Sequence, residues 1–199
     1  MINRRLTVLI VAVFAACSTS EEVASDLVNP MEEVRAGSEE LLRKGAVLFY
    51  RDAPLNGFVL DYYEDGNLKS KTTYIKGKKH GTSHHRYQNG SIKEIREYAE
   101  NNKVGYHRGY WPNGNLKFTY HFKDGMHHGV AREWFVHGQM FKQFNFVEGR
   151  EDGSQKMWTE DGAIRANYVV KDGRRYGLIG LKNCKSVSDE TGLYASLAY

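Results

Sequence analysis

The sequence predicts an all-β protein, an elongated single-layer antiparallel meander of stacked hairpins with a short helix before it. Two observations predict this fold: glycine recurs at a fixed spacing of 24 residues, and apolar and polar residues alternate between the glycines. A fixed period in this range is typical of a repeat array. A helical array is excluded because glycine every 9 to 15 residues would interrupt the helices. The glycines that set the period are Gly57, Gly81, Gly105, Gly129, Gly153 and Gly177.

Two further sets of glycines mark the turns. The first follows Asp, Asn or His and comprises Gly66, Gly90, Gly114, Gly138 and Gly162. The second comprises Gly77, Gly125, Gly149 and Gly173, with Asn101 in place of one glycine. Asp-Gly and Asn-Gly pairs predict two-residue type I′ hairpin turns, in which both residues have positive φ. Each 24-residue unit therefore contains two turns and two strands of about six to eight residues.

The strands show a period of two. When each repeat is numbered from its first glycine, positions 12, 16 and 18 are mostly apolar and positions 13 and 17 mostly polar. This alternation predicts strands with one buried and one solvent-facing side. Aromatic residues also occur in pairs at positions 6 and 7, as in Tyr110-Trp111.

The repeated unit, G-x4-[YW]-[YWF]-x2-G-x-[LIM]-K with a later D/E/K-G, resembles the MORN-repeat variant of bacterial YwqK-type proteins. The resemblance covers five full repeats from residue 57 and a degenerate half repeat before them, which together define a domain over 46–177. It implies a twisted β-meander and no catalytic chemistry. The antitoxin label of that family implies a toxin as a partner.

The first 17 residues have the layout of an export signal. Arg4 and Arg5 precede an apolar run over 6–14, and small residues lead to Cys17. The Ala-Ala-Cys sequence resembles a lipoprotein signal, which implies that Cys17 becomes the acylated first residue of a membrane-anchored protein. Ser18 resembles the signal for sorting to the outer membrane, so we expect an envelope lipoprotein. Secretion after Ala16 and an uncleaved anchor are the alternatives.

The segments on either side of the repeats are predicted from composition. Residues 18–30 are expected to form a flexible tether, and residues 31–45 a short helix that ends at Gly45 and covers the open edge of the sheet. Residues 178–199 are expected to form a C-terminal cap or tail.

Charge and motifs exclude several classes of function. Loss of Arg4 and Arg5 with the signal would lower the formal net charge from +4 to +2, which is too small for a dedicated nucleic-acid binder. The sequence contains no recognisable catalytic motif and no phosphate-binding loop, so we predict neither a catalytic residue nor a cofactor. The eight histidines do not have metal-ligand spacing and are expected to be solvated residues at turns.

Cys184 is the one thiol that would remain after acylation of Cys17. An unpaired cysteine in an oxidising compartment is compatible with a redox thiol, a soft-metal ligand, an intermolecular disulfide or a small buried residue.

A basic column at position 13 is the best candidate for binding. Equivalent positions recur every two strands, roughly 9.5–10 Å apart, so these cations could match an anionic polymer or lipid headgroups. The alternative is a solvated polar face, and Phe141 interrupts the column. The column consists of Lys69, Lys93, Lys117 and Arg165.

The sequence therefore predicts a non-catalytic, lipid-anchored envelope scaffold that binds a protein or an anionic envelope component. An antitoxin-like partner of an envelope toxin and a redox or copper accessory centred on Cys184 are the alternatives.

Overall fold

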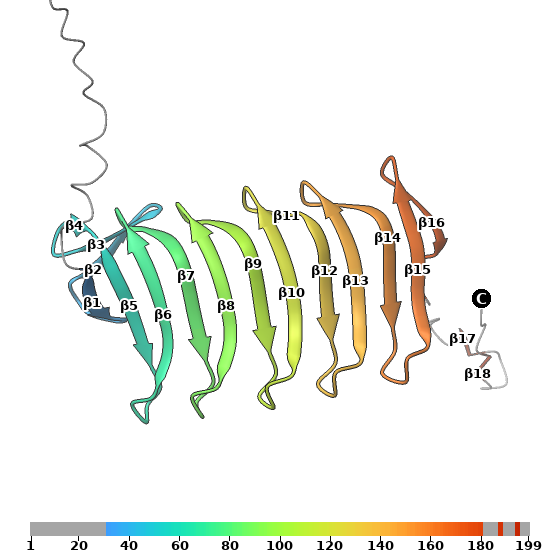
Figure 1. Cartoon of the computed structure of the whole chain (residues 1–199), viewed down its shortest axis with the longest axis horizontal. Helices are drawn as coiled ribbons and strands as arrows, with labels where there is room; N and C mark the ends of the chain where they lie inside the picture. The colour runs from blue at the N-terminus through green and yellow to red at the C-terminus, as the bar shows by residue number, and fades with distance from the viewer. Residues whose placement is uncertain (1–30, 181–186, 189–193, 196–199) are drawn as a thin grey trace, which may run out of the picture. The chain divides into compact units, whose positions relative to one another are not determined.

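The computed structural model describes residues 31–180, 187–188 and 194–195, and their regular secondary structure consists of strands. Most of these strands form one 13-stranded sheet, in which the strands from β5 onward follow one another in sequence order and β1 lies beside β5 (Figure 1). The predicted meander of antiparallel hairpins is confirmed. The described residues include no helix that could cross a membrane. The successive strands are β5 (Gly57–Tyr62), β6 (Leu68–Ile75), β7 (Lys78–Arg86), β8 (Ile92–Ala99), β9 (Asn102–Tyr110), β10 (Leu116–Lys123), β12 (Gly129–Trp134), β13 (Met140–Val147), β14 (Arg150–Trp158), β15 (Ile164–Lys171) and β16 (Arg174–Leu178), with β11 (Met126–His127) beside β10.

Two kinds of turn alternate at opposite ends of the strands (Figure 1). Lys76 and Gly77 have φ of 50° and 72°, as the predicted type I′ turn requires. The turns that contain the Gly66 set differ from the prediction. Tyr63 N–H donates to Asn67 O and Gly66 N–H donates to Tyr63 O, which encloses a three-residue loop. Only the glycine of this loop is left-handed, with φ of 86° at Gly66, so the loop is a type I turn followed by a glycine bulge.

Position 13 is the extra residue of a β-bulge in every repeat. Asp61 pairs with Ser70 and Tyr62 with Leu68, so Lys69 has no partner in the ladder. The same shift in strand register leaves the equivalent residue of each other repeat without a partner in the ladder. These residues are Lys93, Lys117, Phe141 and Arg165. A bulge re-aims the side chain of its extra residue. The predicted strict alternation therefore fails at this position.

The segment before the repeats forms strands, where the sequence predicted a helix over 31–45. β1 (Glu32–Arg35) pairs in parallel with β5, and β2 (Leu41–Lys44), β3 (Val47–Tyr50) and β4 (Ala53–Pro54) form a three-stranded sheet. Gly37, with φ of 82°, interrupts the segment between β1 and β2. Tertiary packing overrides the helical composition, because Val34 is buried against Leu48, Leu55 and Tyr74.

The close approach of β1 depends on a missing side chain. A Cβ atom at Gly57 would lie 2.1 Å from the backbone oxygen of Glu32. The first period-setting glycine is therefore also the residue that admits a strand to the edge of the sheet, the edge that the helix was expected to cover.

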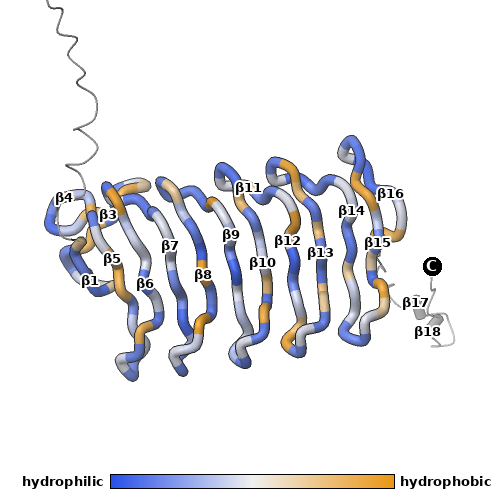
Figure 2. Tube along the Cα trace, in the orientation of Figure 1, coloured by the Kyte–Doolittle hydropathy of each residue, from blue (hydrophilic) through white to orange (hydrophobic). Residues whose placement is uncertain are grey.

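Hydrophobic and hydrophilic residues alternate along the strands (Figure 2). One face of the sheet, which we call the aromatic face, buries Tyr74, Phe118, Phe122 and Tyr168. Cross-strand pairs such as Tyr168 with Gln155 lie on the same face, because side chains alternate between the two faces along each strand. Of the expected C-terminal cap over 178–199, the structure describes residues 178–180 and the antiparallel pair of β17 (Val187–Ser188) and β18 (Tyr194–Ala195). The rest of the cap lies outside the described residues.

Candidate binding site

An aromatic pocket opens at the hairpin ends of the third and fourth repeats. Its volume is about 280 Å³, and six of its eight lining residues are aromatic. The pocket lies at the end of the sheet that carries the three-residue loops, since it includes positions 6, 7 and 13 of these repeats. The lining residues are Trp111, Lys117, Phe118, Tyr120, Glu133, Trp134, Phe135 and Phe141.

One carboxylate lies among the rings. The Tyr120 hydroxyl donates to Glu133 Oε1 over 2.8 Å, and Lys142 Nζ forms an ion pair with the same oxygen. Burial and the hydrogen bond to Glu133 raise the pKa of Tyr120 far above its usual value, so this hydroxyl remains a donor at physiological pH. The charge of Glu133 is thus balanced by Lys142 beside the pocket, which leaves the aromatic surface as the main feature of the pocket.

The position-13 cations lie over the position-7 rings of their own hairpins. Lys117 Nζ lies 4.3 Å from the centre of the Trp111 ring, and Lys93 Nζ lies 5.6 Å from that of Tyr87. Lys69 Nζ lies 6.0 Å from the ring of Tyr63 and also pairs with Asp61 at 2.8 Å. The hydrogen bond that Lys69 donates to Asp61 raises the pKa of Lys69. The bulge thus pairs each of these cations with a ring, a contact that strand alternation does not predict.

Phe141 completes the same pattern instead of interrupting it. Its ring lies 5.0 Å from that of Phe135, the position-7 residue of its hairpin. An aromatic pair therefore replaces the cation and ring of the other hairpins, and both rings line the pocket. Arg165 is exposed, and position 7 of its hairpin is Thr159.

The hairpin ends are joined to each other by the position-7 side chains. Tyr63 Oη donates to Arg86 O over 2.8 Å, and Tyr87 Oη donates to Tyr110 O over 2.8 Å. Trp111 Nε1 continues the series with a bond of 3.1 Å to Trp134 O. We call this series the turn ladder. It fixes the spacing of the loops that border the pocket.

Two histidines that were expected to be solvated pack among aromatic rings: His107 is buried and His127 is half-buried. His107 is 2% exposed, and its Nε2–H donates to Glu97 O over 2.9 Å. The rings of His107 and His127 lie on either side of Phe122, at 4.5 and 4.3 Å between centroids. Burial, with Lys103 nearby, lowers the pKa of both histidines. Among the described residues, no group of three or more potential ligands could hold a metal ion.

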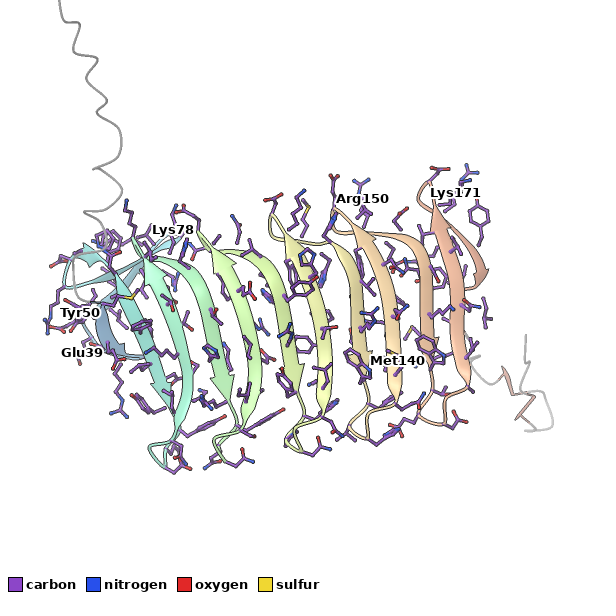
Figure 3. The ribbon with its side chains drawn as sticks, viewed as in Figure 1. Glu39, Tyr50, Lys78, Met140, Arg150 and Lys171 are labelled. Atoms are coloured by element: carbon purple, nitrogen blue, oxygen red, sulfur yellow. The ribbon has the colours of Figure 1, made fainter. Side chains whose placement is uncertain are left out.

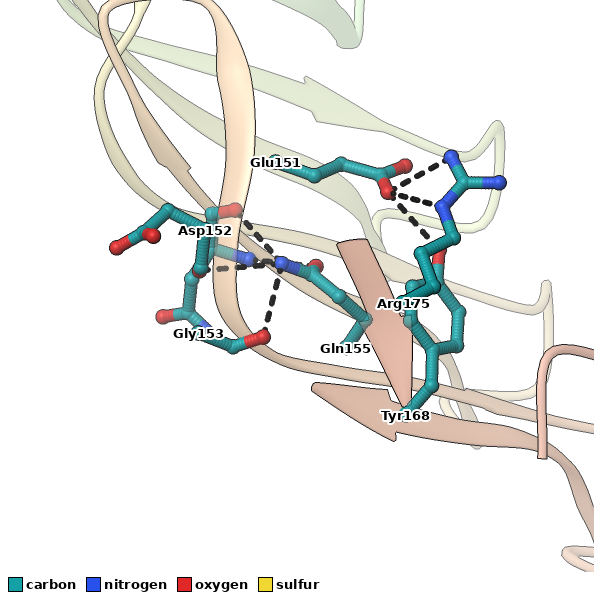
Figure 4. Close-up of polar contacts among 7 residues, drawn as sticks. Glu151, Asp152, Gly153, Gln155, Tyr168 and Arg175 are labelled. Atoms are coloured by element: carbon teal, nitrogen blue, oxygen red, sulfur yellow. Dashed lines mark hydrogen bonds and ion pairs between the residues drawn. The ribbon is translucent and has the colours of Figure 1, made fainter. Parts of the chain in front are cut away.

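The opposite end of the strands is polar. Lys78, Arg150 and Lys171 lie at this end, near the two-residue turns (Figure 3). Here Glu151 accepts hydrogen bonds from Arg175 at 2.9 Å and from the Tyr168 hydroxyl at 3.1 Å (Figure 4). These contacts pair the charges of the last repeat locally. The aromatic pocket at the other end is therefore the better candidate for a binding site.

Two segments of the repeat array are similar in sequence to a known repeat family. The fixed period, paired turns and glycine bulges are those of a hairpin array with 24-residue units. Two segments match the MORN repeat variant. They are residues 56–76 and 103–124, each of which covers the three-residue loop and the strand that follows it. No curated protein matches the chain. MORN repeats generally serve as binding and scaffold repeats, and the family is non-catalytic.

The pocket was not predicted, although the sequence contains a signal for it. Position 7 is aromatic and position 13 is lysine in three repeats, both are phenylalanine in the fourth, and the fifth has threonine and arginine. The pairs are Tyr63/Lys69, Tyr87/Lys93, Trp111/Lys117, Phe135/Phe141 and Thr159/Arg165. The sequence shows which residues occupy these two positions, but only the bulge in the structure shows that their side chains are in contact. Cys17 and Cys184 lie outside the described residues.

Proposed function

We propose that this protein is a non-catalytic binding scaffold of the bacterial cell envelope, held at the outer membrane by a lipid on Cys17. The observation that carries the binding role is the aromatic pocket of the third and fourth repeats. Trp, Tyr and Phe are the residues that most often dominate protein interfaces. The match to a repeat used for binding supports the same role.

The dimensions of the pocket favour a protein partner. Its volume of about 280 Å³ is at the lower limit of the roughly 300–1,000 Å³ typical of small-molecule sites. A pocket of this size suits one or two side chains inserted from a partner surface. Glu133 already has Lys142 and Tyr120 as partners, so the preferred insert is apolar or aromatic.

Phe141→Lys provides a sharp test of the pocket. Three other repeats carry lysine at this position, so the fold accepts the residue, while the change places a charge in the aromatic lining. We expect the full chain to capture an envelope protein that Phe141→Lys no longer captures, with at least tenfold weaker binding of the purified partner. Arg165→Lys, at the same position but outside the pocket, should bind normally. Equal binding by all three proteins would refute the pocket as the site.

The anchor is tested separately. A fatty-acid analogue should label the protein, and Cys17→Ser should remove both the label and the membrane association. A Cys17→Ser protein that remains labelled in the membrane fraction would exclude this mode of attachment.

A further inference from the structure

A second row of cations crosses the sheet on the face opposite the aromatic pocket. Strand pairing connects the row without a gap, and neutral residues alternate with the basic ones. The residues in contact order are His84, Ile95, Arg108, Thr119, Arg132, Gln143 and Lys156. We call Arg108, Arg132 and Lys156, which occupy position 4 of their repeats, the transverse row. His84 holds the same position two strands before Arg108, and beyond it the pairing continues to Lys71, which forms an ion pair with Glu33.

The transverse row faces away from the aromatic side. Arg108 lies between His107 and Gly109, which are both buried, and Lys156 follows Gln155, which is fully buried. Successive side chains of a strand point to opposite faces, so the row is on the solvent side of the sheet. Arg108 is exposed, and Arg132 and Lys156 are half-exposed.

The charges of the row are not neutralised by neighbours. Among the described residues, no carboxylate pairs with Arg108, Arg132 or Lys156, and Arg132 Nε donates to the neutral Gln143 Oε1 at 3.0 Å. On the same strands, the residues two places before and two places after each cation point to the same face and are uncharged. They are Tyr106 and Tyr110, Val130 and Trp134, and Ser154 and Trp158. The cations therefore form a line and not a broad basic patch.

The spacing of the line restricts the ligand. Members are two strands apart, which corresponds to roughly 9.5 Å, and Arg108 to Lys156 spans about 19 Å. A nucleic-acid strand carries a phosphate about every 3.4 Å, far more densely than the row. Thr119 and Gln143, which are uncharged, occupy the positions between the cations. An anionic membrane would match cations spread over an area better than a single line.

We infer that the transverse row binds a linear acidic polysaccharide in which an anionic group recurs once per disaccharide. Successive charges of such a polymer are about as far apart as neighbouring cations of the row. Arginine holds a carboxylate or sulfate by two parallel hydrogen bonds, and lysine adds a point charge at the same interval. Several weak contacts along one chain then add through the high effective concentration of the linked groups. This inference rests on the scaffold role of the proposed function but does not use its pocket.

The test compares two triple variants that lose the same charge at the same spacing. The row variant is Arg108→Gln, Arg132→Gln and Lys156→Gln, and the matched control is Lys69→Gln, Lys93→Gln and Lys117→Gln. Binding of the full chain to hyaluronate, whose carboxylates recur once per disaccharide, is measured at several salt concentrations. We expect the row variant to bind at least tenfold more weakly with a flatter salt dependence, and the control to change less than twofold.

Other outcomes refute the inference in distinct ways. Equal losses in both variants would show a response to net charge alone. Tighter binding of a single-stranded oligonucleotide or of phosphatidylglycerol vesicles than of hyaluronate would assign the row to another occupant. If the triple variant does not fold, the exposed Arg108→Gln alone must weaken binding at least twofold, and normal binding would overturn the inference. Phe141→Lys should still bind hyaluronate, so the proposed role of the pocket and that of the transverse row can be refuted separately.

Discussion

The side chain of Gln155 takes the place of a strand partner for Asn145. Its Oε1 accepts a hydrogen bond from Asn145 N at 3.0 Å, and its Nε2 donates to Asn145 O at 2.9 Å. Gln155 Nε2 also reaches the backbone oxygens of Asp152 and Gly153, at 3.1 and 3.4 Å (Figure 4). The strand pairing shifts at this point, so a carboxamide satisfies backbone groups that the ladder omits. Gln155 is 0% exposed, and water does not compete for these bonds.

Replacement of Gln155 by leucine should destabilise the protein strongly. Leucine preserves the size of the side chain but leaves the N–H and C=O of Asn145 buried without partners, at a cost of about 2–4 kcal/mol. Urea denaturation followed by circular dichroism measures the difference. Gln88→Leu removes an exposed hydrogen bond to Asp65 and should change stability by less than about 0.5 kcal/mol. Equal effects of the two substitutions would contradict this role for Gln155.

Stability should decrease as the pH falls below about 6.5, the ordinary pKa of histidine. Burial lowers the pKa of His107 and His127 in the folded state, so the unfolded chain binds more protons below that pH. The contribution is complete above pH 6.5 and is lost as the pH falls toward the folded-state values. Urea unfolding at intervals between pH 5 and pH 8 measures the slope.

The double variant His107→Phe and His127→Phe should reduce this slope, whatever its absolute stability. His85, whose pKa burial also lowers, accounts for part of the remainder. The control His137→Asn changes an exposed residue of a three-residue loop and should retain the full slope. A double variant with an unchanged slope would show that other groups are responsible.

Two glycines should be sensitive to alanine for different reasons. Gly114 has φ of 86° and open space around it, so Gly114→Ala costs about 1–2 kcal/mol of backbone strain. A Cβ atom at Gly109 would lie 2.1 Å from Phe118 Cε1, so Gly109→Ala must displace a buried ring, at a cost of about 1–3 kcal/mol. Thermal denaturation in a Phe118→Leu background separates the two causes. The smaller side chain should rescue Gly109→Ala and leave the cost of Gly114→Ala unchanged.

The turn ladder should contribute to stability one bond at a time. Tyr87→Phe keeps the ring under Lys93 and removes only the bond to Tyr110 O, which should cost about 1 kcal/mol. Tyr106→Phe, at a residue that is 56% exposed, serves as the control and should be nearly neutral. If chemical denaturation gives the same small effect for both, the ladder bonds do not contribute to stability.

Glycine spacing was sufficient to predict the hairpins, because a residue with positive φ recurs wherever the chain must reverse. The type of turn was predictable only in part. Lys76-Gly77 is a type I′ turn, but the turn at Gly66 contains one more residue than the Asp-Gly pair suggests. A dipeptide does not determine which flanking residues close the loop.

The features that were missed depend on pairing between strands. Counting alternate residues predicts that Lys69 is exposed, as it is, but the count does not reveal the bulge that places it over the Tyr63 ring. Helical composition around Glu32 and Glu33 gave no indication that Val34 would be buried by distant residues. His107 was assigned to the surface because local sequence does not reveal that Tyr98 and Phe122 flank it in the core.

The turn ladder gives the array a modular length. Each of its bonds joins residues 23 positions apart, so each hairpin end is held by the next hairpin and not by a distant part of the chain. Stability in such an assembly is a sum of units and the joints between neighbours. Removal or insertion of 24 residues within the regular array would therefore preserve the kinds of contact between neighbouring hairpins. It would change the number of position-4 cations by one. The length of polymer that the transverse row can bind would therefore increase or decrease in steps of one repeat.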